Sequence, residues 1–364
     1  MKTTISTAII IFVFFSLQSL AVEPTSNKDK SWWNSPYPSQ FDNTQLTKEL
    51  DFISVQGNKL VDESGKQVIF RGVNIADPDK LLREGQWSEN LFKEIKAWGA
   101  NIVRLPIHPV SWQGHGKEAY FKLIDQAIIW ANAQDMYIII DWHSIGYLPV
   151  ELFQHPMYDT TMKETRTFWK DIAFRYTGVS TVAVYELFNE PTVQGGRAGK
   201  ANWLEWKALN EELIDIIYAH DKKVVPLIAG FNWAYDLRPI QQNPINRKGV
   251  AYTAHPYPQK AKPAIKSKEN YFKLWDDVWG FAAKDYPIIA TELGWVNADG
   301  KGAHIPVIND GSYGPHIIEF MQDRNISWVV WAFDPDWSPT MISDWDFTPT
   351  EQGTFFKKEM LKHP

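Results

Sequence analysis

The stretch TVAVYELFNEP, residues 181–191, begins with a run of apolar and β-branched residues and ends in the triplet Asn189-Glu190-Pro191. A short apolar run that stops at polar and turn-forming residues is typical of a strand buried on both faces. Strands of this kind belong to parallel sheets, in which polar side chains can gather at the carboxyl ends. The stretch therefore predicts a parallel α/β fold.

Seven further runs of this kind occur along the chain, and longer amphipathic stretches separate them. The predicted strands cover residues 68–75, 101–107, 136–142, 182–188, 224–229, 250–255, 287–292 and 326–333. The predicted helices cover residues 88–98, 117–133, 161–176, 203–220, 271–284, 314–324 and 350–362, whereas the helix after the fifth strand is poorly marked. Eight alternations predict a (β/α)8 TIM barrel, with an open doubly wound sheet as the alternative.

The N-terminal 48 residues differ from this pattern. Lys2 precedes an apolar run at residues 8–15, and Ser19-Leu20-Ala21 fits a cleavage site, so residues 1–21 are predicted to be a signal peptide cleaved after Ala21. We therefore expect a secreted or periplasmic protein that is free of the membrane. Residues 22–48 are rich in Ser, Asn, Pro and Lys, which predicts an extended arm.

Residues 49–364 are predicted to form a single barrel domain, because no repeat or low-complexity linker divides them. Within this domain, residues 52–67 are predicted to form a hairpin that turns around residues 62–65. We expect this hairpin to plug the bottom of the barrel.

The composition excludes several classes of function. A formal charge of −6, with no stripe of Lys and Arg between aromatic residues, argues against nucleic acid as a partner. The one basic stretch, residues 260–268, is interpreted as a solvated loop. The chain has no cysteine, and its nine histidines include no HExxH motif, so neither a thiolate nucleophile nor a catalytic zinc is expected, and no cofactor is predicted.

Polar residues stand where the predicted strands end. These residues are Arg104, Asp141, His143, Asn189, Glu190, His255, Tyr257, Glu292, Asp334 and Asp336, together with Trp331. Glu190 and Glu292 follow the fourth and seventh strands, so they face each other across the mouth of a barrel, as glycoside hydrolysis requires of its two carboxyl groups. Either glutamate taken singly could instead form an ion pair with Arg104. Glu186 shares the face of Glu190 but lies deeper, which favours a buried ion pair.

Two motifs, VYELFNEP at 184–191 and ATELGW at 290–295, resemble the signatures of glycoside hydrolase family 5. The motifs NIVRLPI, DWHS, HPY and WVVWAF supply the family's other expected residues in the expected order. All eight are present: Arg104, His143, Asn189, Glu190, His255, Tyr257, Glu292 and Trp331. The resemblance covers the chain from about residue 52 onward, and it is greatest to the cellulase-like, retaining β-glucanases.

The resemblance implies a double displacement in which Glu292 attacks the anomeric carbon and Glu190 acts first as acid and then as base. Arg104 and Tyr257 would then stabilise the ionised form of Glu292. Asn189 would bind the sugar 2-hydroxyl. His143 and His255 would position the sugar and Glu190, and Trp331 would form the floor beneath the attacked ring.

The implied substrate is a β-1,4-linked glucan, or a mixed β-1,3/1,4-glucan of the lichenan type. The same eight residues also serve β-mannanases and xyloglucan hydrolases, because loop residues outside the motifs discriminate between these sugars. A non-catalytic carbohydrate-binding barrel is the alternative from another class of protein. A metal-dependent isomerase or lyase is a third alternative function, which would need several acidic side chains around one metal ion.

The chain has 18 tryptophans, more than a core of this size needs, and sugar rings stack on such faces. We expect two or three tryptophans on loops after strand ends to stack on sugars. The candidates are Trp112, Trp142, Trp233, Trp295, Trp337 and Trp345. Trp32 and Trp33 in the arm are predicted either to fold over the cleft, in the same or a neighbouring subunit of a homo-oligomer, or to pin the arm to the barrel exterior.

Overall fold

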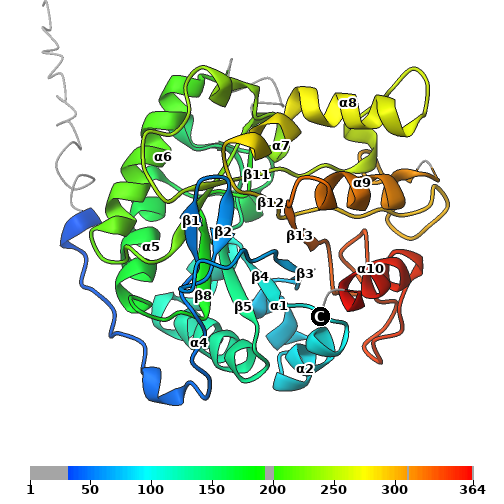
Figure 1. Ribbon diagram of the computed structural model, residues 1–364. Coiled ribbons are helices and arrows are strands. Elements are labelled where there is room, and N and C mark those ends of the chain that lie inside the picture. The colour runs from blue at the N-terminus through cyan, green and yellow to red at the C-terminus, as the bar shows by residue number, and fades with distance from the viewer. Residues whose placement is uncertain (1–31, 193–200, 310, 363–364) are drawn as a thin grey trace, which may run out of the picture.

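The computed structural model of the protein describes residues 32–192, 201–309 and 311–362 (Figure 1). The predicted signal peptide and the first ten residues of the arm lie outside the described residues. Within the described ranges, no helix is both long enough and apolar enough to cross a membrane.

Eight parallel strands form a closed barrel, as predicted, so the open-sheet alternative is wrong. The barrel closes where β13 pairs with β3, with Trp328 opposite Arg71. The strands in order around the barrel are β3 (Arg71–Asn74), β4 (Ile102–Ile107), β5 (Tyr137–Trp142), β8 (Val182–Glu186), β10 (Val225–Ala229), β11 (Ala251–Thr253), β12 (Ile288–Ala290) and β13 (Ser327–Val330).

Helices surround the barrel (Figure 1). The principal ones are α2 (Glu89–Ala97), α4 (Lys117–Ala133), α5 (Met162–Arg175), α6 (Trp203–Tyr218), α8 (Lys268–Val278), α9 (Tyr313–Gln322) and α10 (Glu351–Leu361). Shorter ones are α1 (Pro78–Arg83) and α3 (Pro109–His115). After β10 the chain forms only the short α7 (Phe231–Ala234) and the 3-10 turn η5 (Arg238–Gln241), which explains the weak helical signal there.

The helix ends follow from local sequence signals. Thr161 and Ser267 stand just before α5 and α8, and each side chain accepts a hydrogen bond from a backbone N–H of the first turn. A small sheet of β6 (Ile145–Tyr147), β7 (Leu152–Phe153) and β9 (Glu190–Pro191) lies outside the barrel, and it holds the segment that carries Glu190.

The lower half of the barrel interior is apolar and is closed by the predicted hairpin. Strands β1 (Ser54–Gln56) and β2 (Lys59–Val61) pair antiparallel around residues 57–58, a first turn that was not predicted. The predicted turn at residues 62–65 follows β2, because Val61 bridges to Gln67 and the Val68 N–H donates to the Leu60 carbonyl oxygen. Ile53 and Leu60 pack against inward-facing residues of the strands, which confirms the plug.

Strand alternation makes the upper half of the interior polar. Inward side chains recur every second residue, so Ile102 is followed by Arg104, and Val184 by Glu186. On β3 the interior position is Gly72, where a Cβ would lie only 1.9 Å from the carbonyl oxygen of Ile102. The close approach of β3 and β4 therefore requires glycine at this position.

The described part of the arm lies on the outside of the barrel against α4 and α5 (Figure 1). The Lys170 ammonium group donates to the carbonyl oxygen and hydroxyl of Ser35, each at 2.6 Å. Trp32 packs against the core, and Trp33 is 53% exposed. The expectation that these rings fold over the cleft of their own subunit is wrong, because the polar contacts hold the arm on the exterior.

Candidate active site

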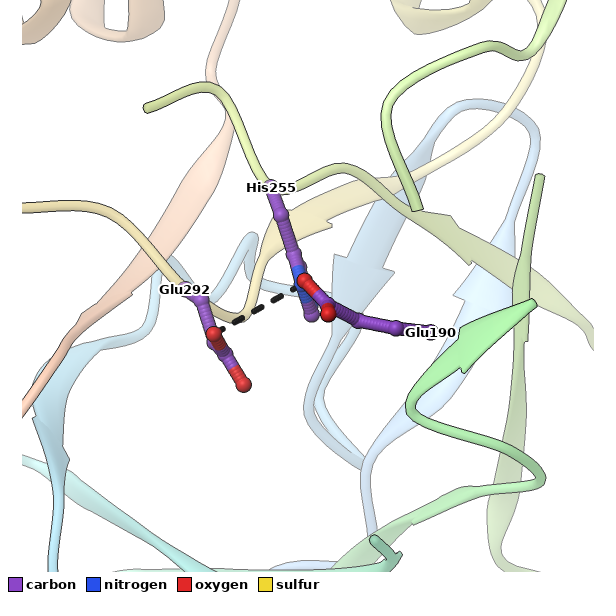
Figure 2. Close-up of side chains that lie close together, drawn as sticks. All are labelled: Glu190, His255 and Glu292. Atoms are coloured by element: carbon purple, nitrogen blue, oxygen red, sulfur yellow. Dashed lines mark hydrogen bonds and ion pairs between the residues drawn. The ribbon is translucent and has the colours of Figure 1, made fainter. Parts of the chain in front are cut away.

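Glu190 and Glu292 lie at the carboxyl-terminal end of the barrel and come from different strand segments. Glu190 begins β9, beyond the end of β8, and Glu292 follows β12. One carboxylate oxygen of each glutamate and a ring nitrogen of His255 lie within 4.8 Å of one another, and the three side chains point toward a common centre (Figure 2). Both glutamates are largely buried, and both line the same cleft.

Glu292 is held by a cation and a hydroxyl group. The Arg104 guanidinium donates to its Oε1 atom at 3.0 Å, and the Tyr257 hydroxyl donates to its Oε2 atom at 2.8 Å. Burial raises the pKa of Glu292, while the charges of His255 and Arg104 and the Tyr257 hydroxyl oppose this rise. Both oxygens therefore have fixed partners that favour the carboxylate.

Glu190 has a different partner, the imidazole of His255. Nδ1 of His255 lies 2.9 Å from Oε1 of Glu190 and 3.7 Å from Oε2 of Glu292. Burial alone would lower the pKa of His255, but the charge of Glu292 and the contacts with Glu186 and Glu190 raise it to about 9. The two glutamates therefore differ in environment, as two carboxyl groups with different tasks must.

Arg104 organises the floor of the site. Its guanidinium bonds to Glu186 at 2.7 and 3.0 Å, and to Asn189 Oδ1 at 2.7 Å. Asn74 Oδ1 accepts a further bond at 2.8 Å, and Asp141 lies 3.0 Å away. Glu186 is fully buried in this ion pair, as predicted. The guanidinium thus joins residues on or just after four strands, β3, β5, β8 and β12, and fixes Asn189 and Glu292 relative to each other.

The cleft above these residues has a volume of about 700 Å³. His143, Asn189, Tyr257 and Trp331 line it beside the two glutamates. Nδ2 of Asn189 is buried and, among the described residues, has no hydrogen-bond partner. An amide group that lines a cleft with an unused donor is available to a ligand hydroxyl.

Two aromatic rings that line the cleft, those of His143 and Trp331, belong to a row of three rings. The Trp331 ring lies 5.5 Å from the His143 ring at an interplanar angle of 11°. The Trp337 ring lies 5.9 Å from the Trp331 ring at 8°. His143 is in turn held by Asp141, whose Oδ2 atom lies 2.6 Å from its Nδ1 atom. The three rings are therefore nearly parallel, and His143 and Trp331 are the two of them that line the cleft.

Glu190, His255 and Glu292 are also spaced so that they could offer ligand atoms to a cation. However, the Arg104 guanidinium already bonds to Glu292, and the pKa of His255 is raised to about 9. A metal ion would have to displace one positive group or lie beside it. The arrangement therefore suits a pair of acid and base groups better than a metal centre.

The model of the family described as Cellulase (glycosyl hydrolase family 5) matches residues 61–336, about three quarters of the chain. The chain belongs to glycosyl hydrolase family 5. The matched range spans the barrel from β3 to β13 and includes both glutamates.

Solved structures and curated relatives agree with this family 5 assignment. A β-glucanase from Saccharophagus degradans is 64% identical, with a TM-score of 0.88, over 91% of this chain and 98% of that one. The catalytic domain of the Thermobifida fusca endoglucanase Cel5A, 22% identical with a TM-score of 0.67, shares the fold over 85% of this chain and 97% of its own.

Among curated relatives, an endoglucanase from Clostridium saccharobutylicum is 26% identical over 77% of this chain and 56% of its own length. The family 5 chain thus spans little more than half the length of the first curated relatives that it matches.

The tryptophan predictions divide between the cleft and the core. Trp233 lines the cleft, whereas Trp337 stacks on Trp331 and is not among the residues that line the cleft. The predictions for Trp142, Trp295 and Trp112 are wrong. Trp142 is fully buried against Phe168, Trp295 packs against Tyr313, Phe355 and Phe356, and Trp112 packs among Tyr120, Phe121 and Phe168. Trp345 is half-buried against the core and is not among the residues that line the cleft.

Sequence reasoning missed several cleft residues of this family 5 protein. Tyr158, Gln154 and Lys260 all line the cleft. The Lys260 ammonium group donates to the carbonyl oxygen of Asn232 at 2.7 Å and lies 5.0 Å from the centre of the Trp233 ring. The interpretation of residues 260–268 as a solvated loop is therefore wrong at its first residue. Nothing in the local sequence distinguishes this lysine, because its partners lie 27 and 28 residues away.

Proposed function

We propose that the chain is an exported, retaining β-glycoside hydrolase that cleaves β-1,4-linked glucan, including mixed β-1,3/1,4-glucan. Glu292 is the nucleophile and Glu190 is the acid and base. The observation that carries the proposal is the separation of the two carboxylates, because one oxygen of each lies within 4.8 Å of one oxygen of the other. A retaining pair needs about 5–5.5 Å, whereas an inverting pair needs roughly 6.5–9.5 Å to admit a water molecule.

The division of roles rests on the partners of each glutamate. Glu292 receives bonds from Arg104 and Tyr257 that stabilise its charge and aim its oxygens, as a nucleophile requires. Glu190 contacts the imidazole of His255, a group that can share a proton with it. Once Glu292 carries a sugar, its negative charge is gone, and Glu190 can act as the base that accepts a proton from water.

A glucan substrate is favoured by the cleft and by the relatives. Trp331 offers a flat surface beneath the attacked ring, and Asn189 has an unused donor for a 2-hydroxyl. The Saccharophagus degradans β-glucanase has been crystallised with cellotetraose. β-Mannanase and xyloglucan hydrolase remain the alternatives that use the same groups. A non-catalytic sugar-binding barrel is less favoured, because binding alone does not require two carboxylates this close together.

The stereochemical outcome tests the mechanism. Proton NMR of a β-glucan digest at early times should reveal β-anomeric reducing ends first, followed by slow mutarotation. A first-formed α-anomer would contradict the double displacement. Reducing-sugar release from barley glucan, cellulose, xyloglucan and mannan tests the substrate, and a preference for mannan would overturn the glucan assignment.

We also propose that residues 1–21 direct export and that the arm joins copies of the chain. The exposed Trp33 and Tyr37 side chains are the apolar groups that the arm offers to a neighbour. Sedimentation velocity of the mature chain and of a variant lacking residues 22–48 tests the second point. A mature chain that sediments as a monomer at high concentration would refute it, and N-terminal sequencing of exported protein tests cleavage after Ala21.

A further inference from the structure

Thr291, the residue before Glu292, is fully buried, and its hydroxyl group has three polar neighbours. Its Oγ1 atom lies 3.0 Å from Nε2 of His255, 2.8 Å from Oε1 of Glu186 and 2.5 Å from Oγ1 of Thr253. Neither threonine is among the residues that line the cleft. This group of contacts therefore acts on the site from beneath and does not touch a substrate.

The direction of each hydrogen bond follows from the charge of Glu186. Burial would raise the pKa of Glu186, but the Arg104 charge and the contact with His255 outweigh burial and lower it. An ionised carboxylate only accepts hydrogen bonds, so Thr291 gives its one hydroxyl hydrogen to Glu186. Oγ1 of Thr291 can then only accept from its other two neighbours. Nε2 of His255 must carry a hydrogen, and the Thr253 hydroxyl must donate.

We propose that Thr291 is a positioning residue that keeps a hydrogen on Nε2 of His255 and leaves Nδ1 as the nitrogen that shares a proton with Glu190. The inference rests on the proposed function, in which Glu190 changes between acid and base. A transfer between the two groups breaks the Nδ1–H bond and forms an O–H bond on Oε1 of Glu190. The total charge of the pair does not change, because the imidazolium and the carboxylate become neutral together.

The surroundings of His255 are consistent with this arrangement. Glu190, Glu292 and Glu186 face its ring at 2.9, 3.7 and 3.8 Å, from β9, the end of β12 and β8. Glu186 lies near Nε2 of the imidazole, and Glu190 and Glu292 lie near Nδ1, so each ring nitrogen has a carboxylate close to it. A hydrogen on Nε2 therefore has both a hydroxyl acceptor and a nearby carboxylate, while the Nδ1 side faces the reacting pair.

Nitrogen NMR of the wild-type protein tests the inference directly. The protein is labelled with ¹⁵N-histidine and titrated from pH 5 to pH 10, and the His255 signals are assigned by their loss in His255→Gln. We expect the Nε2 shift to stay in the range of a protonated ring nitrogen throughout, while the Nδ1 shift changes. An Nε2 atom that lacks a hydrogen, or that titrates first, would overturn the proposal.

Substitution of Thr291 gives a second readout. Thr291→Val removes the acceptor of the Nε2 hydrogen, so the alkaline limb of the kcat/KM profile should move to lower pH by about one to two units, as expected for one lost hydrogen bond to a charged group. Thr291→Ser keeps the hydroxyl acceptor, so its alkaline limb should lie at the same pH as that of the wild-type protein. An unmoved limb in a folded Thr291→Val protein contradicts the proposal.

The matched control is Thr181→Val, which removes an equally buried hydroxyl that accepts from Asn132, outside the site. Thr181→Val should leave the pH profile unchanged. The comparison therefore separates the loss of a buried hydroxyl group in general from the loss of the acceptor for His255. If Thr291→Val does not fold, the NMR titration of the wild-type protein and the pH profile of Thr291→Ser still test the proposal. Inactive wild-type protein would refute the proposed function, whereas the NMR result would still report on Nε2.

Discussion

The indole planes of Trp331 and Trp337 lie within 8° of each other, and their ring centres are 5.9 Å apart. Trp331 also lies nearly parallel to His143, so the three rings form a row in which His143 and Trp331 line the cleft and Trp337 packs against Trp331. Trp337 is positioned by Asp334, whose Oδ1 atom accepts the backbone N–H of Trp337 at 2.9 Å. Lys80 bonds to the other oxygen of the same aspartate at 2.8 Å.

This arrangement predicts a larger effect of removing the Trp331 ring than of removing the Trp337 ring. Trp331→Ala removes the surface beneath the attacked sugar, so kcat/KM should fall by about thirtyfold or more, equivalent to about 2 kcal/mol. Trp337→Ala should raise KM for long glucans while leaving kcat on short aryl glycosides nearly unchanged, because this ring packs against Trp331 and does not itself lie beneath the attacked sugar. Steady-state kinetics on both substrate types checks the difference, and equal losses from the two variants on both substrates would contradict distinct roles for the two rings.

The two glutamates should respond differently to azide. Glu190→Ala should slow hydrolysis of an aryl β-cellobioside by about 10²–10⁴-fold, and azide should restore part of the rate with a β-linked azide as product. Glu292→Ala should give an α-linked azide or no product. Circular dichroism of both variants establishes that they are folded. A β-linked azide from Glu292→Ala would mean that the assigned roles are reversed.

The sequence predicted the barrel because strand signals are local. Most strands are short apolar or β-branched runs, and most carry at their ends a polar residue that the two-residue period of a strand directs into or out of the barrel; β10, which ends at Ala229, carries none. The same period explains why Trp142 was misplaced. Asp141 points into the barrel toward Arg104, so its neighbour Trp142 must point outward, where it packs against Phe168. Whether a side chain near a strand end reaches the cleft is therefore predicted better by the two-residue alternation along the strand than by its position after the strand end.

Contacts between distant segments could not be predicted in this way. Thr291 is an ordinary β-branched strand residue in the sequence, and its role depends on Glu186 and His255, which are 105 and 36 residues away. Lys260 likewise resembles a solvated lysine in the sequence, and its contacts with Asn232 and Trp233 are visible only in the three-dimensional structure. Only the three-dimensional arrangement of polar partners separates such residues from their neighbours.

The contact of Lys260 predicts a role in holding this loop. Asn232, Trp233 and Ala234 all have positive φ angles between 52° and 59°, a conformation that costs non-glycine residues energy. Lys260→Met removes the bond to the Asn232 carbonyl oxygen but keeps the length of the side chain. We expect KM for β-glucan to rise several-fold with little change in kcat.

Lys266→Met is the matched control, because Lys266 is exposed and is not among the residues that line the cleft. It should leave both constants unchanged. A Lys260→Met variant that lost kcat with unaltered KM would place this lysine in the chemical step instead and would contradict a role in holding the loop.

The raised pKa of His255 predicts how stability depends on pH. A histidine whose pKa is higher in the folded state stabilises the fold fully below its unfolded pKa of 6.5, and this contribution is lost as the pH rises through about 9. The full contribution is about 3 kcal/mol, from 1.36 kcal/mol per pKa unit. Burial also raises the pKa of Glu292, which works in the same direction but at more acidic pH.

Urea unfolding at fixed intervals from pH 5.5 to pH 9.5 should therefore reveal a falling free energy of unfolding above pH 6.5. His255→Gln should be less stable than wild type at pH 6, because Glu190 and Glu186 then lose a positive neighbour. The gap between the two proteins should narrow toward pH 9.5, since wild-type His255 is by then losing its charge. A gap that widened as the pH rose would mean that His255 is neutral in the folded protein, and a constant gap would mean that folding does not shift its pKa; either result would contradict the prediction.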